Sequence, residues 1–280
     1  MEKQFFQQPT IFVKDISINV TNLTQSLNFY QNVLGFHVLS QTNSKVVLTA
    51  DGETPILSIE QPDNVTPKEP RTTGLYHFAI LLPSRADLSA FLKHIIQQGV
   101  QLGASDHYVS EALYFNDPDG NGIEVYRDRP STEWNWKDGQ VAMATEPLDG
   151  DSLINESEKS WNGMPKETVM GHIHLHVADL KETENFYVNG LGMDIVTNYP
   201  GALFASYGGY HHHIGLNVWN GVGAKSPAEN SVGLNWLRLV IPNETTREKI
   251  IQQLQDIGAT VSNENTVEDP AGNRIKLTVL

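Results

Sequence analysis

The sequence predicts an α+β protein built from four copies of one small βαβββ module. Two observations predict this class. Separate stretches of the 280-residue chain align with one another without gaps. Each stretch also passes from the alternating hydrophobic pattern of a strand to the longer repeat of an amphipathic helix. We number the modules one to four and place them at roughly residues 10–62, 74–128, 170–220 and 232–280.

Modules one and three open alike. The stretch DISINVTNLTQSLNFYQNVLGFHVL, from Asp15, aligns with HIHLHVADLKETENFYVNGLGMDIV, from His172, and both contain Asn-Phe-Tyr followed by Leu-Gly. Each begins with period-2 alternation, reaches an Asn or Asp suited to cap a helix, and continues as an amphipathic helix that a Gly ends. The expected order is strand, then helix.

Modules two and four also match each other. GLYHFAILLP, from Gly74, resembles GLNWLRLVIP, from Gly233, and each is followed by a stretch with helical periodicity. Both modules end in a turn and a strand, DPDGNGIEVY from Asp117 and DPAGNRIKLTV from Asp269. Asp-Pro and Gly-Asn supply the turn chemistry before an alternating strand.

Residues 129–169 separate two halves of the chain, 10–128 and 170–280. This segment is polar and interrupted by prolines, which indicates a linker with one short helix. A length of 280 residues suits two domains, each with its own core.

The composition excludes several classes of function. Lys and Arg number 19 against 33 Asp and Glu, a formal charge of −14, which argues against nucleic-acid or anionic-membrane binding and favours a small ligand. The chain has no cysteine, so a metal must be held by His, Asp or Glu. The N-terminal stretch lacks a leader pattern and no 18-residue apolar run occurs, from which we expect a cytoplasmic protein.

Taken together, the strand opened by His, the Asn-Phe-Tyr and Leu-Gly pair, and DPDGNGIEVY resemble the vicinal oxygen chelate superfamily, which includes glyoxalases, bleomycin resistance proteins and extradiol dioxygenases. The pattern is especially similar to that of two-domain bacterial dioxygenases of the catechol 2,3-dioxygenase type. The resemblance covers nearly all of the chain except the linker. It implies two open, cupped mixed-sheet domains made of paired modules, with a divalent metal inside a cup.

The resemblance also implies where metal ligands would stand. The corresponding positions of the opening and closing strands hold Asp15, His77, His172, Trp236, Glu124 and Lys276. An indole offers no lone pair to a metal and an ammonium repels one, so module four supplies no ligand. His77, Glu124 and His172 remain, two imidazoles and one carboxylate, the donor set of non-heme Fe(II) oxygenases.

This ligand set predicts an unusual pairing of modules. His77 and Glu124 belong to module two and His172 to module three, so these two modules would share the working site and modules one and four would form a partner domain without metal. The alternative is sequential pairing, with Asp15, His77 and Glu124 as ligands. Taken singly, a histidine on an apolar strand is more often a core residue, and Glu124 facing outward would merely be solvated.

Other candidates come from the same resemblance. Tyr114 stands where extradiol enzymes carry a tyrosine that hydrogen-bonds the substrate, although it could be a packed aromatic residue. His107 could reach substrate from a loop or lie on the surface. The stretch YHHHIGLNVW, from Tyr210, is similar to the segment with an acid-base histidine, matched here by His212.

Strand alternation places His211 and His213 on one face and His212 on the other. In the competing interpretation the three histidines form a polar strand with water-exposed edges. We expect His174 to line the cavity and leave His176 unassigned.

The predicted function is an Fe(II)-dependent extradiol dioxygenase that acts on catechol or a substituted catechol with O2. Mn(II) or another divalent metal accepts the same donors, and a homo-oligomer is compatible with the sequence. Two alternatives stay open. One is a glyoxalase-like metal-dependent isomerase or lyase, which usually recruits a fourth protein ligand. The other is a metal-free, drug-sequestering binding protein.

Overall fold

The computed structural model describes residues 1–280 and contains the four predicted modules. Module one comprises β1 (Phe12–Asn19), α1 (Leu23–Asn32), β2 (His37–Gln41), β3 (Lys45–Thr49) and β4 (Pro55–Glu60). Module two comprises β5 (Gly74–Leu81), α2 (Arg85–Gln97), β6 (Gly103–Asp106), β7 (Ser110–Asn116) and β8 (Gly122–Asp128).

The second half repeats this order with two variations. Module three comprises β12 (Val169–His176), α4 (Leu180–Glu184), β13 (Asp194–Tyr199), β14 (Ala202–Ser206) and β15 (Ile214–Asn217). Its helix continues beyond α4 as a π-helical turn, Asn185–Gly190. Module four comprises β16 (Gly233–Ile241), α5 (Glu244–Asp256), β17 (Thr266–Glu268) and β18 (Arg274–Val279). It lacks one full strand, because Val261 forms only an isolated bridge with Val267.

A polar side chain caps each module helix at its N-terminus, as the sequence predicts for modules one and three. The side-chain oxygens of Asn22, Ser84, Asp179 and Asn243 each accept a hydrogen bond from the backbone N–H three residues later. These caps satisfy backbone donors that have no partner inside the helix. They fix the point at which each chain segment turns from strand to helix.

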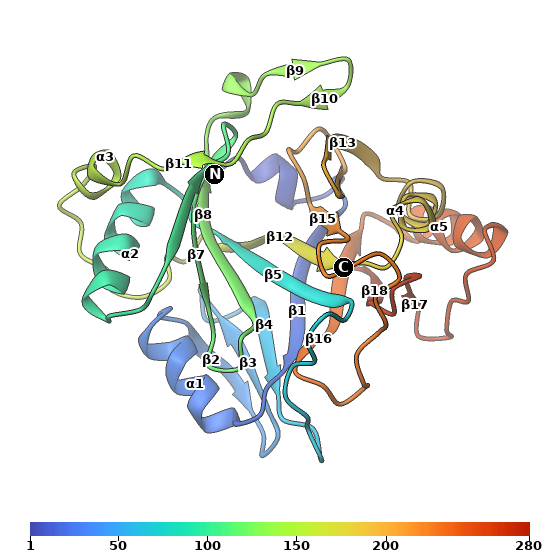
Figure 1. The fold of residues 1–280 in the computed structure, drawn as a ribbon, viewed down its shortest axis with the longest axis horizontal. Helices are drawn as coiled ribbons and strands as arrows, with labels where there is room; N and C mark the ends of the chain where they lie inside the picture. The colour runs from blue at the N-terminus through green and yellow to red at the C-terminus, as the bar shows by residue number, and fades with distance from the viewer.

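The strands form two large sheets, and each sheet combines modules from different halves of the chain. The nine-stranded sheet has the order β11-β6-β7-β8-β5-β12-β15-β14-β13, and the seven-stranded sheet the order β17-β18-β16-β1-β4-β3-β2. The opening strands β5 and β12 are antiparallel neighbours, as are β1 and β16, and Figure 1 shows both pairs near the centre of the molecule. The predicted pairing of module two with three, and of one with four, is therefore confirmed.

The repeated motifs hold neighbouring modules together within each half. The Tyr30 hydroxyl donates to the Asp117 carboxylate at 2.9 Å, and the Tyr187 hydroxyl to Asp269 at 3.0 Å. Both tyrosines are fully buried. The tyrosine of the Asn-Phe-Tyr motif in one module thus contacts the aspartate of the Asp-Pro turn in the next. Fifty buried apolar residues, from all four modules and from the segment 129–169, form one continuous cluster around these contacts.

The segment 129–169 is more than a connection. It contains β9 (Trp136–Lys137), β10 (Gln140–Val141), β11 (Glu146–Pro147) and the expected short helix, α3 (Gly150–Ile154). β11 extends the nine-stranded sheet by pairing with β6, and α3 packs on α2 (Figure 1). None of the helices has the length and apolar character needed to cross a membrane.

Candidate metal centre

Three neighbouring strands bring His77, Glu124 and His172 to one face of the nine-stranded sheet. Ala79 on β5 lies opposite Glu124 on β8 and opposite His172 on β12. Residues opposite one another share a face, and His77 shares it too because it precedes Ala79 by two residues. The small side chain of Ala79 thus lies between the two flanking residues and leaves room above it.

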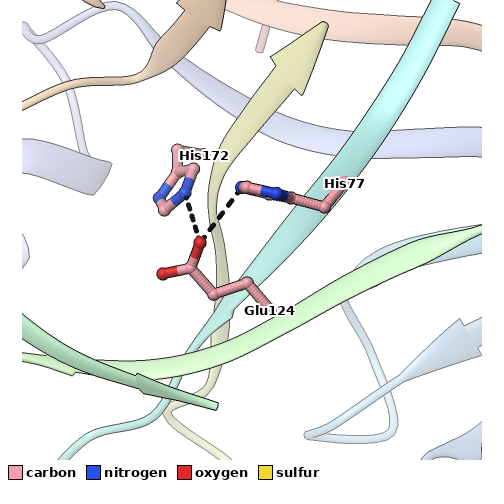
Figure 2. Close-up of side chains that lie close together, drawn as sticks. All are labelled: His77, Glu124 and His172. Carbon is pink, nitrogen blue, oxygen red and sulfur yellow. Dashed lines mark hydrogen bonds and ion pairs between the residues drawn. The ribbon is translucent and has the colours of Figure 1, made fainter. Parts of the chain in front are cut away.

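The three side chains converge on a single oxygen atom. The Oε2 atom of Glu124 lies 3.0 Å from Nε2 of His77 and 3.1 Å from Nε2 of His172, as Figure 2 shows. One candidate ligand atom of each residue lies within 4.8 Å of the others. All three residues are buried, with Glu124 only 2% exposed, so the outward, solvated orientation of Glu124 is wrong.

The donor set fits a divalent metal. His77 Nε2 is buried and has no hydrogen-bond partner of good geometry, although it lies 3.0 Å from Oε2 of Glu124. A buried polar atom without a partner is costly, and a lone pair directed away from hydrogen-bond partners is what a metal ligand offers. Two imidazoles and a carboxylate leave further coordination positions for small molecules.

The electrostatics of the cluster favour a cation. Burial alone would raise the pKa of Glu124, but the adjacent His172 and His77 outweigh it and hold this pKa well below its usual range. Burial lowers the pKa of His77, and the nearby carboxylate only partly opposes that shift. An ionised carboxylate beside a neutral imidazole is the protonation state that metal binding requires.

Glycines stand where side chains would collide with the site. Gly122 lies opposite His77 and Gly215 opposite His174 in the sheet. A Cβ on Gly122 would come within 2.2 Å of the Tyr76 carbonyl oxygen, and one on Gly215 within 2.8 Å of the His174 ring. Isolated glycines within strands often mark such close approaches.

The cluster opens into a cavity of about 230 Å³. This is smaller than the roughly 300–1,000 Å³ of pockets for drug-sized ligands, so it suits a small one. Tyr76, Tyr199 and Trp219 line it and are 40–46% exposed, which makes an aromatic rim. The segment 143–145 forms part of the wall, a contribution that its linker-like composition did not predict.

Tyr114 and His107 lie together in this cavity. Tyr114 is opposite Glu124 in the sheet, and its hydroxyl is 2.6 Å from His107 Nε2. The other ring nitrogen of His107 is 2.5 Å from the carbonyl oxygen of Ala144. An N–H at Nδ1 donates to that carbonyl, so Nε2 accepts from the tyrosine hydroxyl. His107 is half-buried and is held at the cavity. This position does not fit the alternative, a histidine on a surface loop.

The histidine triplet differs from its predicted setting. It lies in the connection from β14 to β15, just before Ile214, so strand alternation does not apply. The three histidines are at most 8% exposed, which contradicts the polar strand with water-exposed edges. They still point to different places. His212 lines the cavity with its ring 4.1 Å from that of His172, whereas His213 contacts the Phe5 carbonyl.

His174 lines the cavity as expected, and Asn217 holds its ring. The Asn217 amide donates to His174 Nε2 at 2.9 Å and its carbonyl accepts from His176 Nδ1 at 2.7 Å. His176 does not line the cavity; its ring lies 4.9 Å from that of Tyr76, at an interplanar angle of 48°. No sequence pattern singles out Asn217 or the aromatic residues of the rim, because their places at the cavity depend on strand register and loop position.

The other sheet has a different chemistry at the corresponding positions. Asp15 forms an ion pair with Arg238 at 2.9 Å, and Lys276 lies over the Trp236 ring at 4.1 Å. Asp15 stands in the seven-stranded sheet, apart from His77 and Glu124. The alternative ligand set with Asp15 is therefore wrong, since sequential pairing of the modules does not occur.

The fold and the donor set define a member of a known superfamily. The sequence profile described as Glyoxalase/Bleomycin resistance protein/Dioxygenase superfamily matches residues 13–125, and the chain belongs to this superfamily.

Two relatives and one solved structure extend the match. The chain is 44% identical over 261 residues to catechol-2,3-dioxygenase of Bacillus subtilis (strain 168), covering 90% of this chain and 92% of that one. It is 29% identical over 118 residues to biphenyl-2,3-diol 1,2-dioxygenase 3 of Rhodococcus globerulus, covering 41% of this chain and 62% of the relative. A crystal structure of a Bacillus subtilis subsp. subtilis str. 168 protein shares the fold, with a TM-score of 0.65 at 13% identity, over 98% of this chain and 86% of that one.

Proposed function

We propose that this protein is an extradiol ring-cleaving dioxygenase that uses Fe(II) to open catechol or a substituted catechol with O2. The observation that carries the proposal is the cluster of two histidines and one glutamate at the base of a small, aromatic-rimmed cavity. The 44% identity to a catechol-2,3-dioxygenase over nine-tenths of the chain supports the same reaction class.

His77, Glu124 and His172 would hold the metal. When bound, Fe(II) supplies Lewis-acid and redox chemistry towards a catecholate and dioxygen. Glu124 carries the negative charge that a divalent ion needs, and the two imidazoles complete the set as neutral donors. Mn(II) accepts the same donors, so the residues alone do not select iron.

The surrounding side chains would bind the ring and move protons. Tyr114 has a hydroxyl directed at His107, and both lie within the cavity, where they can hydrogen-bond a substrate oxygen and hold it in place. His212 lies on another side of the cavity, against His172. A histidine there can take a proton from substrate and return it to product.

The cavity dimensions bear on the substrate. A volume of about 230 Å³ accommodates one substituted ring more readily than a larger ligand. The rings of Tyr76 and Trp219 meet edge to face at 5.5 Å at the exposed rim, where they can cover an aromatic ligand and exclude water. This favours catechol or an alkylcatechol over a two-ring diol.

Oxygen uptake with a panel of catechols tests the proposal. The protein is purified without air and loaded with Fe(II), and His172→Ala is compared with His37→Ala, an exposed histidine of β2. We expect uptake and a ring-opened product with wild-type protein and the His37 variant, and neither with the His172 variant. Fully metal-loaded wild-type protein that consumes no oxygen would favour an isomerase instead, and failure to bind metal would favour a binding protein. The cytoplasmic location and the oligomeric state remain predictions.

A further inference from the structure

A chain of buried hydrogen bonds leads away from His212 to a carboxylate that the proposed function does not use. Nδ1 of His212 lies 2.8 Å from Nδ1 of His211, and Nε2 of His211 lies 2.8 Å from Oδ1 of Asp128. The side chain of His211 is completely buried and that of Asp128 is 7% exposed. Asp128 ends β8, the strand that also carries Glu124.

Further contacts hold the carboxylate at the end of this chain. The Tyr210 hydroxyl donates to Oδ2 of Asp128 at 3.1 Å, and it lies 2.7 Å from the hydroxyl of Tyr126. Tyr126 and Tyr210 are both fully buried. Tyr210 can donate to the carboxylate and accept from Tyr126 at the same time. Asp128 is thereby fixed as an acceptor that faces His211.

With His211 neutral, these contacts determine where the ring protons lie. A neutral imidazole donates from one nitrogen and accepts at the other, and a carboxylate only accepts. Nε2 of His211 therefore carries the proton directed at Asp128, and Nδ1 of His211 accepts. His212 must then donate from its own Nδ1, which leaves a lone pair on Nε2. That nitrogen makes no hydrogen bond within the protein, and the His212 ring lines the cavity.

We propose that Asp128 and His211 are positioning residues that hold His212 in the tautomer whose Nε2 lone pair faces the cavity. This inference rests on the proposed function for its chemical meaning, because the lone pair is what allows His212 to take a proton from substrate. The orientation of His212 is then set before substrate arrives, by a network anchored on β8. Carboxylates commonly orient catalytic or metal-binding histidines in this way, but here a second histidine transmits the effect.

Nitrogen NMR measures the tautomer directly. Long-range ¹H–¹⁵N correlations of ¹⁵N-histidine-labelled protein, loaded with diamagnetic Zn(II), distinguish a protonated ring nitrogen from one with a lone pair. In the wild-type protein we expect His212 to be protonated at Nδ1 and unprotonated at Nε2. In Asp128→Asn, whose amide can donate to His211, we expect the form of His212 protonated at Nε2 to become populated.

Asp119→Asn is the matched control, because it makes the same change of charge at a carboxylate that bonds Thr21 instead. It should leave the His212 pattern as in wild type. A wild-type His212 protonated at Nε2, a doubly protonated His211, or an Asp128→Asn spectrum identical to wild type would each overturn the proposal.

Kinetics supply a second readout on the Fe(II) enzyme. We expect Asp128→Asn to lower kcat by about 10- to 100-fold, as loss of an orienting partner commonly does, while KM stays within about twofold and metal content is unchanged. The NMR result does not depend on turnover. If the wild-type protein cleaves no catechol, the proposed function fails, whereas the tautomer assignment is still decided by the spectra.

Discussion

His172 and Glu124 meet at 3.1 Å although they belong to different halves of the repeated chain. Their contact exists because β5 lies between β8 and β12 and places Ala79 opposite both residues. The pairing of modules two and three thus creates the candidate metal site, whereas modules one and four have Asp15 and Arg238 ion-paired in their own sheet. The same module therefore occurs in two sheets, one with a candidate metal site and the other with an ion pair at the corresponding positions.

Glu124→Gln should remove metal binding while keeping the shape of the side chain. The amide has no negative charge to offset a divalent ion. We therefore expect metal affinity to fall by more than the roughly 10- to 100-fold that is lost when a hydrogen-bond partner of a metal ligand is removed. Metal content after dialysis against Fe(II) without air measures this. Glu53→Gln, on an exposed turn, is the control and should bind metal as wild type does.

Removal of metal should also lower thermal stability. A ligand that binds only the folded state adds about 2.7 kcal/mol when its concentration is 100-fold above Kd, which corresponds to several degrees in the Tm of a chain this size. Calorimetry with and without EDTA should show that loss in the wild type and none in Glu124→Gln. An EDTA-induced shift of equal size in both proteins would place the metal elsewhere.

Gly215→Ala should narrow the cavity without removing a metal ligand. The new methyl group would lie 2.8 Å from the His174 ring, so the imidazole must move, and this ring lines the cavity. We expect a rise in KM and a loss of stability of about 1–3 kcal/mol, as overpacking typically causes, with metal content unchanged. Gly150→Ala, which has no neighbouring atom within 4 Å, should leave KM as in wild type.

Tyr30→Phe and Tyr187→Phe should each destabilise the fold. Each substitution removes a hydroxyl donor from a buried aspartate, Asp117 or Asp269, which still accepts from the side-chain amide of Asn121 or Asn273. Only the net contribution of one hydrogen bond is then lost, about 1 kcal/mol. Urea unfolding measures the loss. The two pairs share no partner, so the double variant should lose the sum of the two. Tyr108→Phe, at a half-exposed tyrosine, should change little, and an equal loss there would contradict the assignment.

Much of this arrangement could be predicted from the sequence because the repeats fix strand and helix order. The same repeats showed that module four offers an indole and an ammonium where a metal needs lone pairs, and this favoured the pairing of modules two and three. The proposed ligands His77, Glu124 and His172 follow from that comparison and from the family resemblance.

The parts that the sequence did not predict depend on tertiary contacts. The triplet was expected on a strand, since Tyr210 to Trp219 is rich in β-forming residues, but the buried contacts of His211 with Asp128 and of His213 with Phe5 hold it in a bend. The segment 143–145 was expected to be a linker, and it borders the cavity because β11 joins the sheet edge. No local pattern reports such contacts.

The pH dependence of stability should reflect His213. Burial lowers its pKa to about 3, with the hydrogen bond to the Phe5 carbonyl opposing the shift, whereas an unfolded histidine titrates near ~6.5. Between these values the unfolded chain binds the proton and the folded chain does not. The contribution of neutral His213 to the free energy of unfolding is therefore fully present above about pH 6.5. It falls as the pH drops below that value, by at most about 1.4 kcal/mol per pH unit for one histidine.

His213→Gln tests this reasoning, because the glutamine keeps a donor but cannot titrate. We expect the free energy of unfolding, measured with urea at pH 7.5 and 5.5, to fall on acidification by about 1.4 kcal/mol less in the variant than in the wild type. Other buried histidines, such as His174, also have lowered pKa values and keep part of the acid sensitivity in the variant. His37→Gln, at an exposed position, should retain the full wild-type loss. A His213→Gln protein with that same loss would mean that His213 accepts a proton in the folded state as readily as in the unfolded chain.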